Sequence, residues 1–210
     1  MTERILTYTS EHRDDVERFR LQTFAEGNHS LDHKKFDPDA LNGQIWLAYV
    51  DDQLVSMTAA EVSHYTAEIN VVRKCRYHIL RSHRHGRYGF KFLKRMIPWC
   101  ADNGYKLLYW THDVTNLPLN ALYQRKRSYA FSADNAYFNE WPYTETRFET
   151  DKLFKTGDML QFVYSIYIDK DFVWQPRGGG HIYYYPHDGD VVKWPEIQDK
   201  ALPADRYTHG

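Results

Sequence analysis

The alternation of apolar and polar residues in the first part of the chain is typical of β-strands. Residues 4–9 form a short β-prone run, and a longer extended run covers 68–80. Between them, the apolar runs at 45–50 and 54–62 are separated only by residues 51–53, which predicts a hairpin with a tight turn. We therefore expect this part of the chain to form neighbouring strands of one sheet.

Helical spacing is found in two other segments. Ser10 is placed to cap a helix over 11–25, with Val16, Phe19 and Phe24 facing inward. Further along, apolar residues from Leu93 to Cys100 recur at i, i+3, i+4 and i+7, which is one face of a helix. The sequence therefore predicts one helix after the first strand and another after the fourth.

The second half of the chain alternates strands and helices before it ends in an aromatic-rich tail. Residues 106–114 have the continuous apolar core that is typical of a buried parallel strand, and residues 117–128 follow as a helix. Extended segments are expected at 136–143 and 160–168, and the tail over 170–210 is expected to contain a small hairpin and a loose end. This order of elements predicts an α/β (α+β) fold.

Length and composition narrow the class of protein. With 210 residues, 42% of them hydrophobic, and a formal net charge of -1, the chain is neither a disordered acidic protein nor a globally basic nucleic-acid binder. Two cysteines are too few for a disulfide framework, and no apolar run is typical of a membrane span or a secretion signal. We expect a cytoplasmic protein without membrane association, with one domain over 1–169 and an extension over 170–210 packed on it.

A basic loop that contains two glycines leads from the 68–80 run into the second helix. A helix N-terminus presents unbonded backbone N–H groups and a partial positive charge, so such a loop can bind anions. Gly86 and Gly89 let the backbone approach a ligand closely, and Arg84 and Arg87 can add charge-assisted hydrogen bonds to a diphosphate. The loop predicts a site for a phosphorylated cofactor; a solvated, arginine-rich turn is the alternative.

The same loop resembles the signature of the GCN5-related N-acetyltransferase (GNAT) superfamily. That signature is Arg or Gln, two residues, Gly, one residue, then Gly or Ala, between the fourth strand and the third helix of the family. In this chain the frame falls on Arg84 to Gly89. Arg87 occupies the place of the first signature glycine, with Gly86 one position earlier, and an Arg can adopt ordinary helical torsions there.

A second motif carries the resemblance independently of the first. Members of the family often have an Asn after the fifth strand and, seven residues later, a Tyr in a Leu-Tyr pair on the next helix. Here these residues are Asn116 and Tyr123, the latter preceded by Leu122. The resemblance covers about residues 4–168 and leaves the tail unexplained.

The resemblance implies a mixed, mostly antiparallel twisted sheet flanked by helices, with the tail as a β-rich extension. It also implies transfer of an acetyl group from acetyl-CoA to a small-molecule or peptide amine, without a metal. The strand before the loop should splay from its neighbour, so that its backbone binds the pantetheine, while Tyr123 protonates the leaving thiolate. The implied cofactor-binding residues are His78, Ile79, Leu80, Arg84, His85, Gly86, Arg87, Tyr88, Gly89 and Asn116.

The residue that deprotonates the amine is left open by the sequence. Glu61 near the end of the third strand is one candidate, and His112 or Asp113 at the end of the fifth strand is another. Each implied role has a plainer alternative: Tyr123 as a packed core tyrosine, and Asn116 as a helix cap.

Two further function classes compete with an acyltransferase. One is a binding protein that keeps an acyl-CoA site without turnover. Another is a nucleic-acid-binding module whose affinity would fall steeply with salt. His83 and His85 form a His-x-His pair, but two ligands make a weak metal site. The cationic residues of the nucleic-acid alternative are Arg73, Lys74, Arg76, Arg81, Arg84 and Arg87.

The acceptor itself is not identified by the sequence, because acceptor pockets in such folds are built by variable loops. The segments that could form the pocket are 28–43, 132–155 and the tail. Aromatic residues of the tail are expected to cover an open edge or face of the sheet, and they also favour a homodimer. These aromatic residues are Trp174, Tyr183, Tyr184, Tyr185 and Trp194.

Overall fold

The polypeptide forms two compact units, each built around antiparallel strands. The first unit comprises residues 1–62 and 73–99, and the second comprises 63–72 and 100–210. The computed structural model describes residues 2–27, 36–62, 70–113, 145–156, 159–174 and 182–184.

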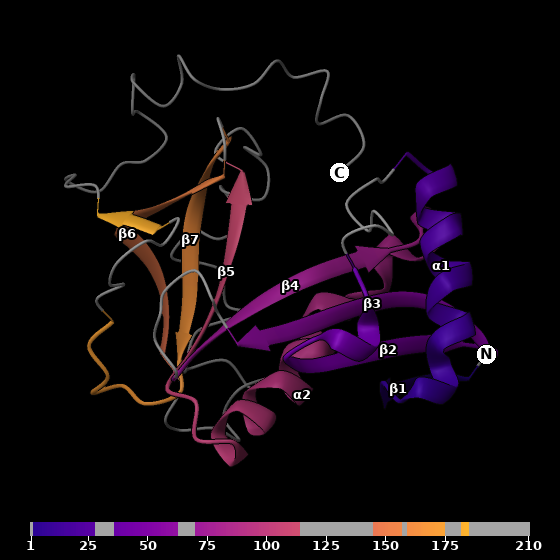
Figure 1. The fold of residues 1–210 in the computed structure, drawn as a ribbon, viewed down its shortest axis with the longest axis horizontal. Coiled ribbons are helices and arrows are strands. Elements are labelled where there is room, and N and C mark those ends of the chain that lie inside the picture. The colour runs from indigo at the N-terminus through magenta and orange to yellow at the C-terminus, as the bar shows by residue number, and fades with distance from the viewer. Residues whose placement is uncertain are drawn as a thin grey trace. The chain divides into compact units, whose positions relative to one another are not determined.

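The first unit combines a strand meander with two helices (Figure 1). Its elements are β1 (Glu3–Thr7), α1 (Arg13–Ala25), β2 (Gly43–Val50), β3 (Gln53–Val62), β4 (Val71–Ile79) and α2 (Tyr88–Asp102). The strands lie in the order β1-β2-β3-β4, and the pairs β1-β2 and β2-β3 are antiparallel. The first two residues of β4 and the last three residues of α2 belong to the second unit.

The predicted hairpin is confirmed as β2 and β3. Asp51 and Asp52 join the two strands, and both have positive φ, 44° and 67°, as a type I′ turn requires. The Thr2 N–H donates to Asp51 Oδ1 at 2.7 Å, and Arg4 pairs with Asp52. These contacts tie the turn to the beginning of β1, the edge strand.

Both faces of β2 are buried because α1 and α2 cover opposite sides. Successive side chains of a strand point to opposite faces, so Trp46 and Tyr49 face different ways. Trp99 of α2 meets Trp46 edge to face, with ring centroids 5.6 Å apart. The Tyr49 hydroxyl donates to Asp15 of α1 at 2.7 Å. The two predicted helices therefore sandwich the hairpin, and the predicted apolar face of α2 is buried.

The start of α1 differs from the prediction, and so does one residue of its inner face: Val16 and Phe19 are buried as predicted, whereas Phe24 is not. Ser10 does not cap the helix: a short 3-10 helix over Ser10–His12 precedes α1, and the Thr9 N–H donates to His12 Nδ1 at 3.0 Å. Phe24 is 53% exposed. One residue turns a helix by about 100°, which carries Phe24 past the buried face. The residues that form this face are Val16, Phe19 and Thr23.

The second unit is an antiparallel arrangement of four described strands. They are β5 (Leu107–Asp113), β6 (Glu145–Thr156), β7 (Met159–Tyr167) and β8 (Ile182–Tyr184), in the order β5-β7-β6-β8. The prediction that β5 is buried is confirmed at its first four residues, and β5 pairs with β7 in an antiparallel manner. Through β8, part of the tail pairs with the outer edge of β6.

The sequence did not predict β6. The register of β6 against β7 shifts between Phe148 and Leu153, and such an irregularity breaks the two-residue period by which a strand is recognised. The expected helix over 117–128 and the expected extended segment over 136–143 lie outside the described residues.

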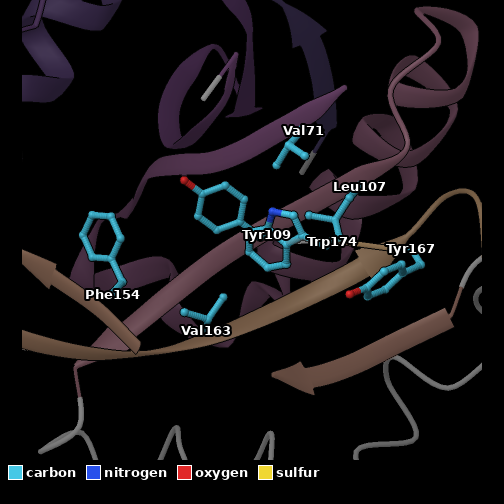
Figure 2. Close-up of a cluster of buried hydrophobic side chains, with 7 residues drawn as sticks. All are labelled: Val71, Leu107, Tyr109, Phe154, Val163, Tyr167 and Trp174. Carbon is cyan, nitrogen blue, oxygen red and sulfur yellow. The ribbon is translucent and has the colours of Figure 1, made fainter. Parts of the chain in front are cut away.

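The core of the second unit is aromatic (Figure 2). Tyr109 of β5 and Trp174, which follows β7, lie with ring centroids 5.1 Å apart. Both are buried, as are the aliphatic side chains Leu107 and Val163 beside them. Trp174 thus packs as a core residue rather than as part of an exposed tail.

These elements give the chain an α/β (α+β) fold, with a mostly antiparallel sheet flanked by helices, as the sequence predicts. Over the described part of the chain, no helix has both the length and the apolar character needed to cross a membrane.

Candidate functional site

An irregularity near the middle of β4 sets the geometry of the strand that leads into the loop. Arg76 has a φ of 53°, a left-handed conformation that is rare for a strand residue other than glycine. On either side of it, hydroxyls of β3 donate to backbone carbonyls of β4: Thr58 to Cys75 at 3.1 Å and Ser56 to His78 at 2.7 Å. A left-handed residue inside a strand changes the direction of the residues that follow it.

Two backbone groups expected to face the pantetheine already have partners. The carbonyl of His78 accepts the hydroxyl of Ser56, and the Leu80 N–H donates to the Val55 carbonyl at 3.0 Å. Ile79 is the half-buried residue between them. A carbonyl has a second lone pair, so His78 keeps acceptor capacity, but the Leu80 N–H is committed to the sheet.

The imidazole of His78 is buried at the same place. Burial, with a smaller contribution from the Arg76 charge, lowers the pKa of His78 to about 4. The ring is therefore neutral near pH 7. The end of β4 is dry on this side, as a site that polarises a carbonyl requires.

The predicted loop is a short 3-10 helix over Arg81–Gly86, followed by Arg87 and then α2. Arg87 adopts a left-handed conformation, φ 54° and ψ 29°. Arg87 therefore does not have the ordinary helical torsions that an Arg can adopt at this position. The side chains of Arg84 and Arg87 are exposed on this loop.

The two loop glycines face tyrosine side chains of the same chain. A Cβ atom on Gly86 would lie 2.2 Å from the ring of Tyr88, which is itself buried. At Gly89, a Cβ atom would lie 3.6 Å from the hydroxyl of Tyr77, an ordinary contact. Gly86 is thus required by the packing of Tyr88, a reason that the sequence did not reveal.

The first turn of α2 has its backbone donors partly committed. The N–H groups of Phe90 and Lys91 donate to the Arg87 carbonyl at 3.1 and 3.3 Å. Burial raises the pKa of Tyr77 above its usual value, while a hydrogen bond from the Gly89 N–H opposes that rise.

Glu26, which sequence reasoning missed, fixes the beginning of the loop. Its carboxylate accepts the Arg81 backbone N–H at 3.0 and 3.2 Å, and the Arg81 guanidinium donates to the Glu26 carbonyl at 2.7 Å. This pair fastens the loop to the end of α1, so Arg81 serves as a structural anchor.

Glu61 lies half-buried at the end of β3 and contacts Cys75 of β4. The Cys75 thiol approaches Glu61 Oε2 at 3.7 Å. Burial, reinforced by the Glu61 charge, raises the pKa of Cys75 to about 12, so the thiol keeps its proton. A neutral thiol is a weak donor, which leaves the carboxylate able to accept a further hydrogen bond.

The other candidate residues are only partly described. His112 and Asp113 end β5 in the second unit, where the His112 ring meets Tyr164 edge to face at 5.4 Å. Asn116, Tyr123 and the side chain of His85 lie outside the described residues.

Metal binding finds little support near the loop. His83 Nδ1 lies 2.8 Å from the hydroxyl of Ser82. Within the described ranges, no group of three or more His, Cys, Asp or Glu residues is placed to hold a metal ion.

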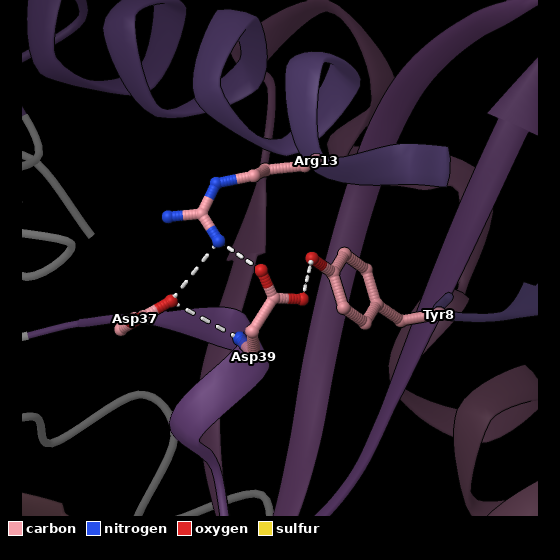
Figure 3. A network of polar contacts seen from close by, with 4 residues as sticks. All are labelled: Tyr8, Arg13, Asp37 and Asp39. Atoms are coloured by element: carbon pink, nitrogen blue, oxygen red, sulfur yellow. Dashed lines mark hydrogen bonds and ion pairs between the residues drawn. The ribbon is translucent and has the colours of Figure 1, made fainter. Parts of the chain in front are cut away.

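A polar network lies beside one of the segments expected to shape the acceptor site (Figure 3). The Tyr8 hydroxyl donates to Asp39 at 2.7 Å, and Arg13 contacts both Asp39 and Asp37. Burial and the Asp39 hydrogen bond raise the pKa of Tyr8 well above its usual value. Arg13 and Asp37 also line a pocket of about 380 Å³ between α1 and Phe36.

A comparison of the sequence with models of protein families finds a match. Residues 9–129, more than half of the chain, match the model of the "Acetyltransferase (GNAT) family". No curated protein matches the sequence.

Solved structures share the fold at low sequence identity. An acetyltransferase of the GNAT family from Streptococcus pneumoniae is 12% identical, with a TM-score of 0.54 over 78% of this chain and 98% of that chain. The loading GNATL domain of CurA from Lyngbya majuscula is 13% identical, with a TM-score of 0.53 over 80% and 98%. A coenzyme A-dependent acyl-homoserine lactone synthase, solved with SAM and isopentyl-CoA, is 14% identical, with a TM-score of 0.50 over 80% and 85%.

Proposed function

The chain belongs to the GNAT family of acetyltransferases, and on that premise we propose that it transfers an acyl group, in the first instance acetyl, from acyl-CoA to an amine. The observation that carries the proposal is the continuous path from the bulged end of β4, through the arginine-bearing loop, to the N-terminus of α2. In this family fold that path is where the acyl-CoA is expected.

The residues on this path suit an acyl-CoA. Arg84 and Arg87 supply exposed positive charge for the diphosphate, and the start of α2 supplies the positive end of a helix dipole. The dry end of β4 around His78 suits the uncharged pantetheine and thioester. The loop thus supplies positive charge for the diphosphate, and the end of β4 supplies an apolar surface for the pantetheine and the thioester.

The reaction we propose is direct transfer. The amine nitrogen forms a bond to the thioester carbonyl carbon, the carbon–sulfur bond breaks, and the free thiol of coenzyme A leaves. Glu61 takes the proton that the amine loses, with His112 and Asp113 as alternatives, and Tyr123 gives a proton to the departing thiolate. A carboxylate whose described neighbour is a neutral thiol, as at Glu61, suits the role of a base.

A second candidate function is supported by the loop itself. Arg87 replaces a glycine of the family signature and adopts a left-handed conformation, and the Tyr77 hydroxyl lies beside Gly89. A chain altered in this way could hold acyl-CoA as a sensor or interaction protein without turning it over.

Release of free thiol from acetyl-CoA in the presence of a panel of primary amines separates the two candidates. The transferase proposal expects amine-dependent release, and Tyr123→Phe and Glu61→Gln should each lower kcat roughly 100-fold. Glu11→Gln is the matched control, because Glu11 is an exposed glutamate on the 3-10 helix before α1. Saturable binding of acetyl-CoA without thiol release from any amine would support the binding protein instead.

The two cysteines favour a cytoplasmic location for the protein. Cys75 and Cys100 are free thiols, which supports a reducing compartment such as the cytoplasm, where acyl-CoA is available.

The role of the loop in binding acetyl-CoA is tested by Gly89→Glu. This substitution places a negative side chain at the start of α2 and should abolish acetyl-CoA binding. Unchanged affinity would show that the loop is not part of the binding site.

A further inference from the structure

Glu61 of β3 and Cys75 of β4 form a contact between two half-buried side chains. Cys75 Sγ lies 3.7 Å from Glu61 Oε2, within hydrogen-bond distance for sulfur. Within the described ranges, this thiol is the one hydrogen-bond partner of the carboxylate, and no Lys or Arg forms an ion pair with it. A half-buried carboxylate without a cationic partner is unusual, because burial penalises its charge. The pair therefore points to a role other than stability.

The backbone of the sheet fixes both side chains. The Thr58 hydroxyl donates to the Cys75 carbonyl at 3.1 Å, which ties β4 to β3 beside the thiol. On the other side of β3, Glu61 pairs with Gly43 of β2, and a Cβ atom on Gly43 would lie only 2.9 Å from the Glu61 Cα. The contact is thus built into the sheet rather than made by two mobile surface chains.

The proton of the pair is on sulfur. Burial, reinforced by the Glu61 charge, raises the pKa of Cys75 to about 12. The charges of Arg73 and Arg76, on the same strand, oppose this rise. Gly43, the residue of β2 opposite Glu61, adds no charge. Near pH 7 the thiol is therefore the donor and the carboxylate is the acceptor.

A carboxylate that receives one thiol proton keeps most of its acceptor capacity. Its two oxygens offer about four lone pairs, and the bond from Cys75 takes one of them on Oε2. Oε1 is left for a further donor, such as the N–H of an amine. Because a thiol is a weak donor, it orients the carboxylate without lowering its basicity as much as a hydroxyl would.

We propose that Cys75 is a positioning residue: its thiol holds Oε2 of Glu61, so that Oε1 faces the amine and takes the proton that the amine loses. This inference rests on the proposed function, in which Glu61 is the base. As the nitrogen bonds to the thioester carbonyl carbon, the amine proton passes to Oε1. The electron pair of the carbon–sulfur bond leaves with the sulfur, which Tyr123 protonates. Cys75 keeps its own proton throughout, and solvent later takes the proton from Glu61.

The test compares Cys75→Ser and Cys75→Val with the wild-type protein. A serine hydroxyl donates more strongly than a thiol and stabilises the ionised carboxylate, whereas valine fills a similar volume and donates nothing. In protein labelled with ¹³C at the glutamate carboxyl carbon, the Glu61 signal should titrate at lower pH in Cys75→Ser, by about half a pH unit or more, and at higher pH in Cys75→Val. A cysteine that only fills space would not move the two midpoints in opposite directions.

Amine-dependent release of thiol from acetyl-CoA supplies the second readout, with the primary amines that the wild type acetylates. The rise of kcat/KM with pH should have a midpoint that follows the Glu61 signal in each variant, and Cys75→Val should lower kcat roughly fivefold. In a Glu61→Gln background the same substitution should have no further effect, because the base that it positions is gone.

Cys100→Ala is the control. Cys100 is the other free thiol of the chain, and burial alone raises its pKa, with no contribution from a carboxylate. This variant should keep the wild-type titration of Glu61 and the wild-type kcat.

Each contrary result has a distinct meaning. Equal Glu61 midpoints in the wild type, Cys75→Ser and Cys75→Val, with amine-dependent turnover intact, would overturn the role of Cys75 alone. An undiminished effect of Cys75→Val in the Glu61→Gln background would do the same, since the cysteine would then act on another group. Absence of thiol release by the wild type with every amine would overturn the proposed function together with this inference. Should Cys75→Val fail to fold, the midpoint of Cys75→Ser decides, because an unmoved or raised midpoint would refute the thiol as donor.

Discussion

Acidification should destabilise this protein through His78. The side chain is 5% exposed and its pKa falls from 6.5 to about 4 on folding, mainly because burial penalises the charged ring. Between these two values the unfolded chain binds a proton that the folded chain does not. The free energy of unfolding therefore falls as pH falls from above 6.5 toward 4.

The size of the effect follows from the shift. A difference of about 2.5 pKa units corresponds to about 3.5 kcal/mol, since each unit is worth about 1.4 kcal/mol. By pH 5 most of the unfolded imidazole is protonated, and roughly 2 kcal/mol of that stability should already be lost.

The assay is urea denaturation of the wild type and of His78→Gln at about pH 7.5 and about pH 5. Glutamine does not titrate, so the wild type should lose roughly 2 kcal/mol more than the variant between the two pH values. Other titrating groups affect both proteins equally and cancel in this comparison. An equal loss of unfolding free energy in the two proteins would refute the claim that His78 is buried and uncharged.

Two further predictions concern two glycines and a cysteine. Gly43→Ala should lower the free energy of unfolding by about 2–4 kcal/mol in urea, because its Cβ would lie 1.9 Å from the Ala60 carbonyl oxygen. Gly104→Ala, with no atom near its Cβ but a φ of 75°, should cost only about 1 kcal/mol; equal losses would contradict the steric argument. Burial raises the pKa of Cys75 to about 12, so its thiol should react with an aromatic disulfide at about pH 8 at least 100-fold more slowly in native protein than in urea, and rapid native reaction would contradict its burial.

Much of the first unit could be predicted from local pattern, because its elements follow the periods that define them. The hairpin, the strand before the loop and the apolar face of α2 are all where the sequence places them. Elements whose geometry departs from those periods could not be predicted. β6, for example, is interrupted by a register shift.

The candidate site was predictable in its position but not in its contacts. The glycine spacing indicates a loop, yet only the folded chain shows that Gly86 makes room for Tyr88. The anchoring of Arg81 by Glu26 joins residues 55 positions apart, and no local pattern encodes such a pair. The conformation of Arg87 is set by the joining of two helices, a tertiary constraint that overrides its helical propensity.

The central claim, that the path from β4 to α2 holds an acyl-CoA, is tested most directly by the thermal midpoint of the purified protein with and without acetyl-CoA. A ligand bound by the folded state alone raises the midpoint by mass action. The account predicts a concentration-dependent rise that adenosine diphosphate reproduces in part and that Gly89→Glu abolishes. An unchanged midpoint of the wild-type protein at millimolar acetyl-CoA would contradict it.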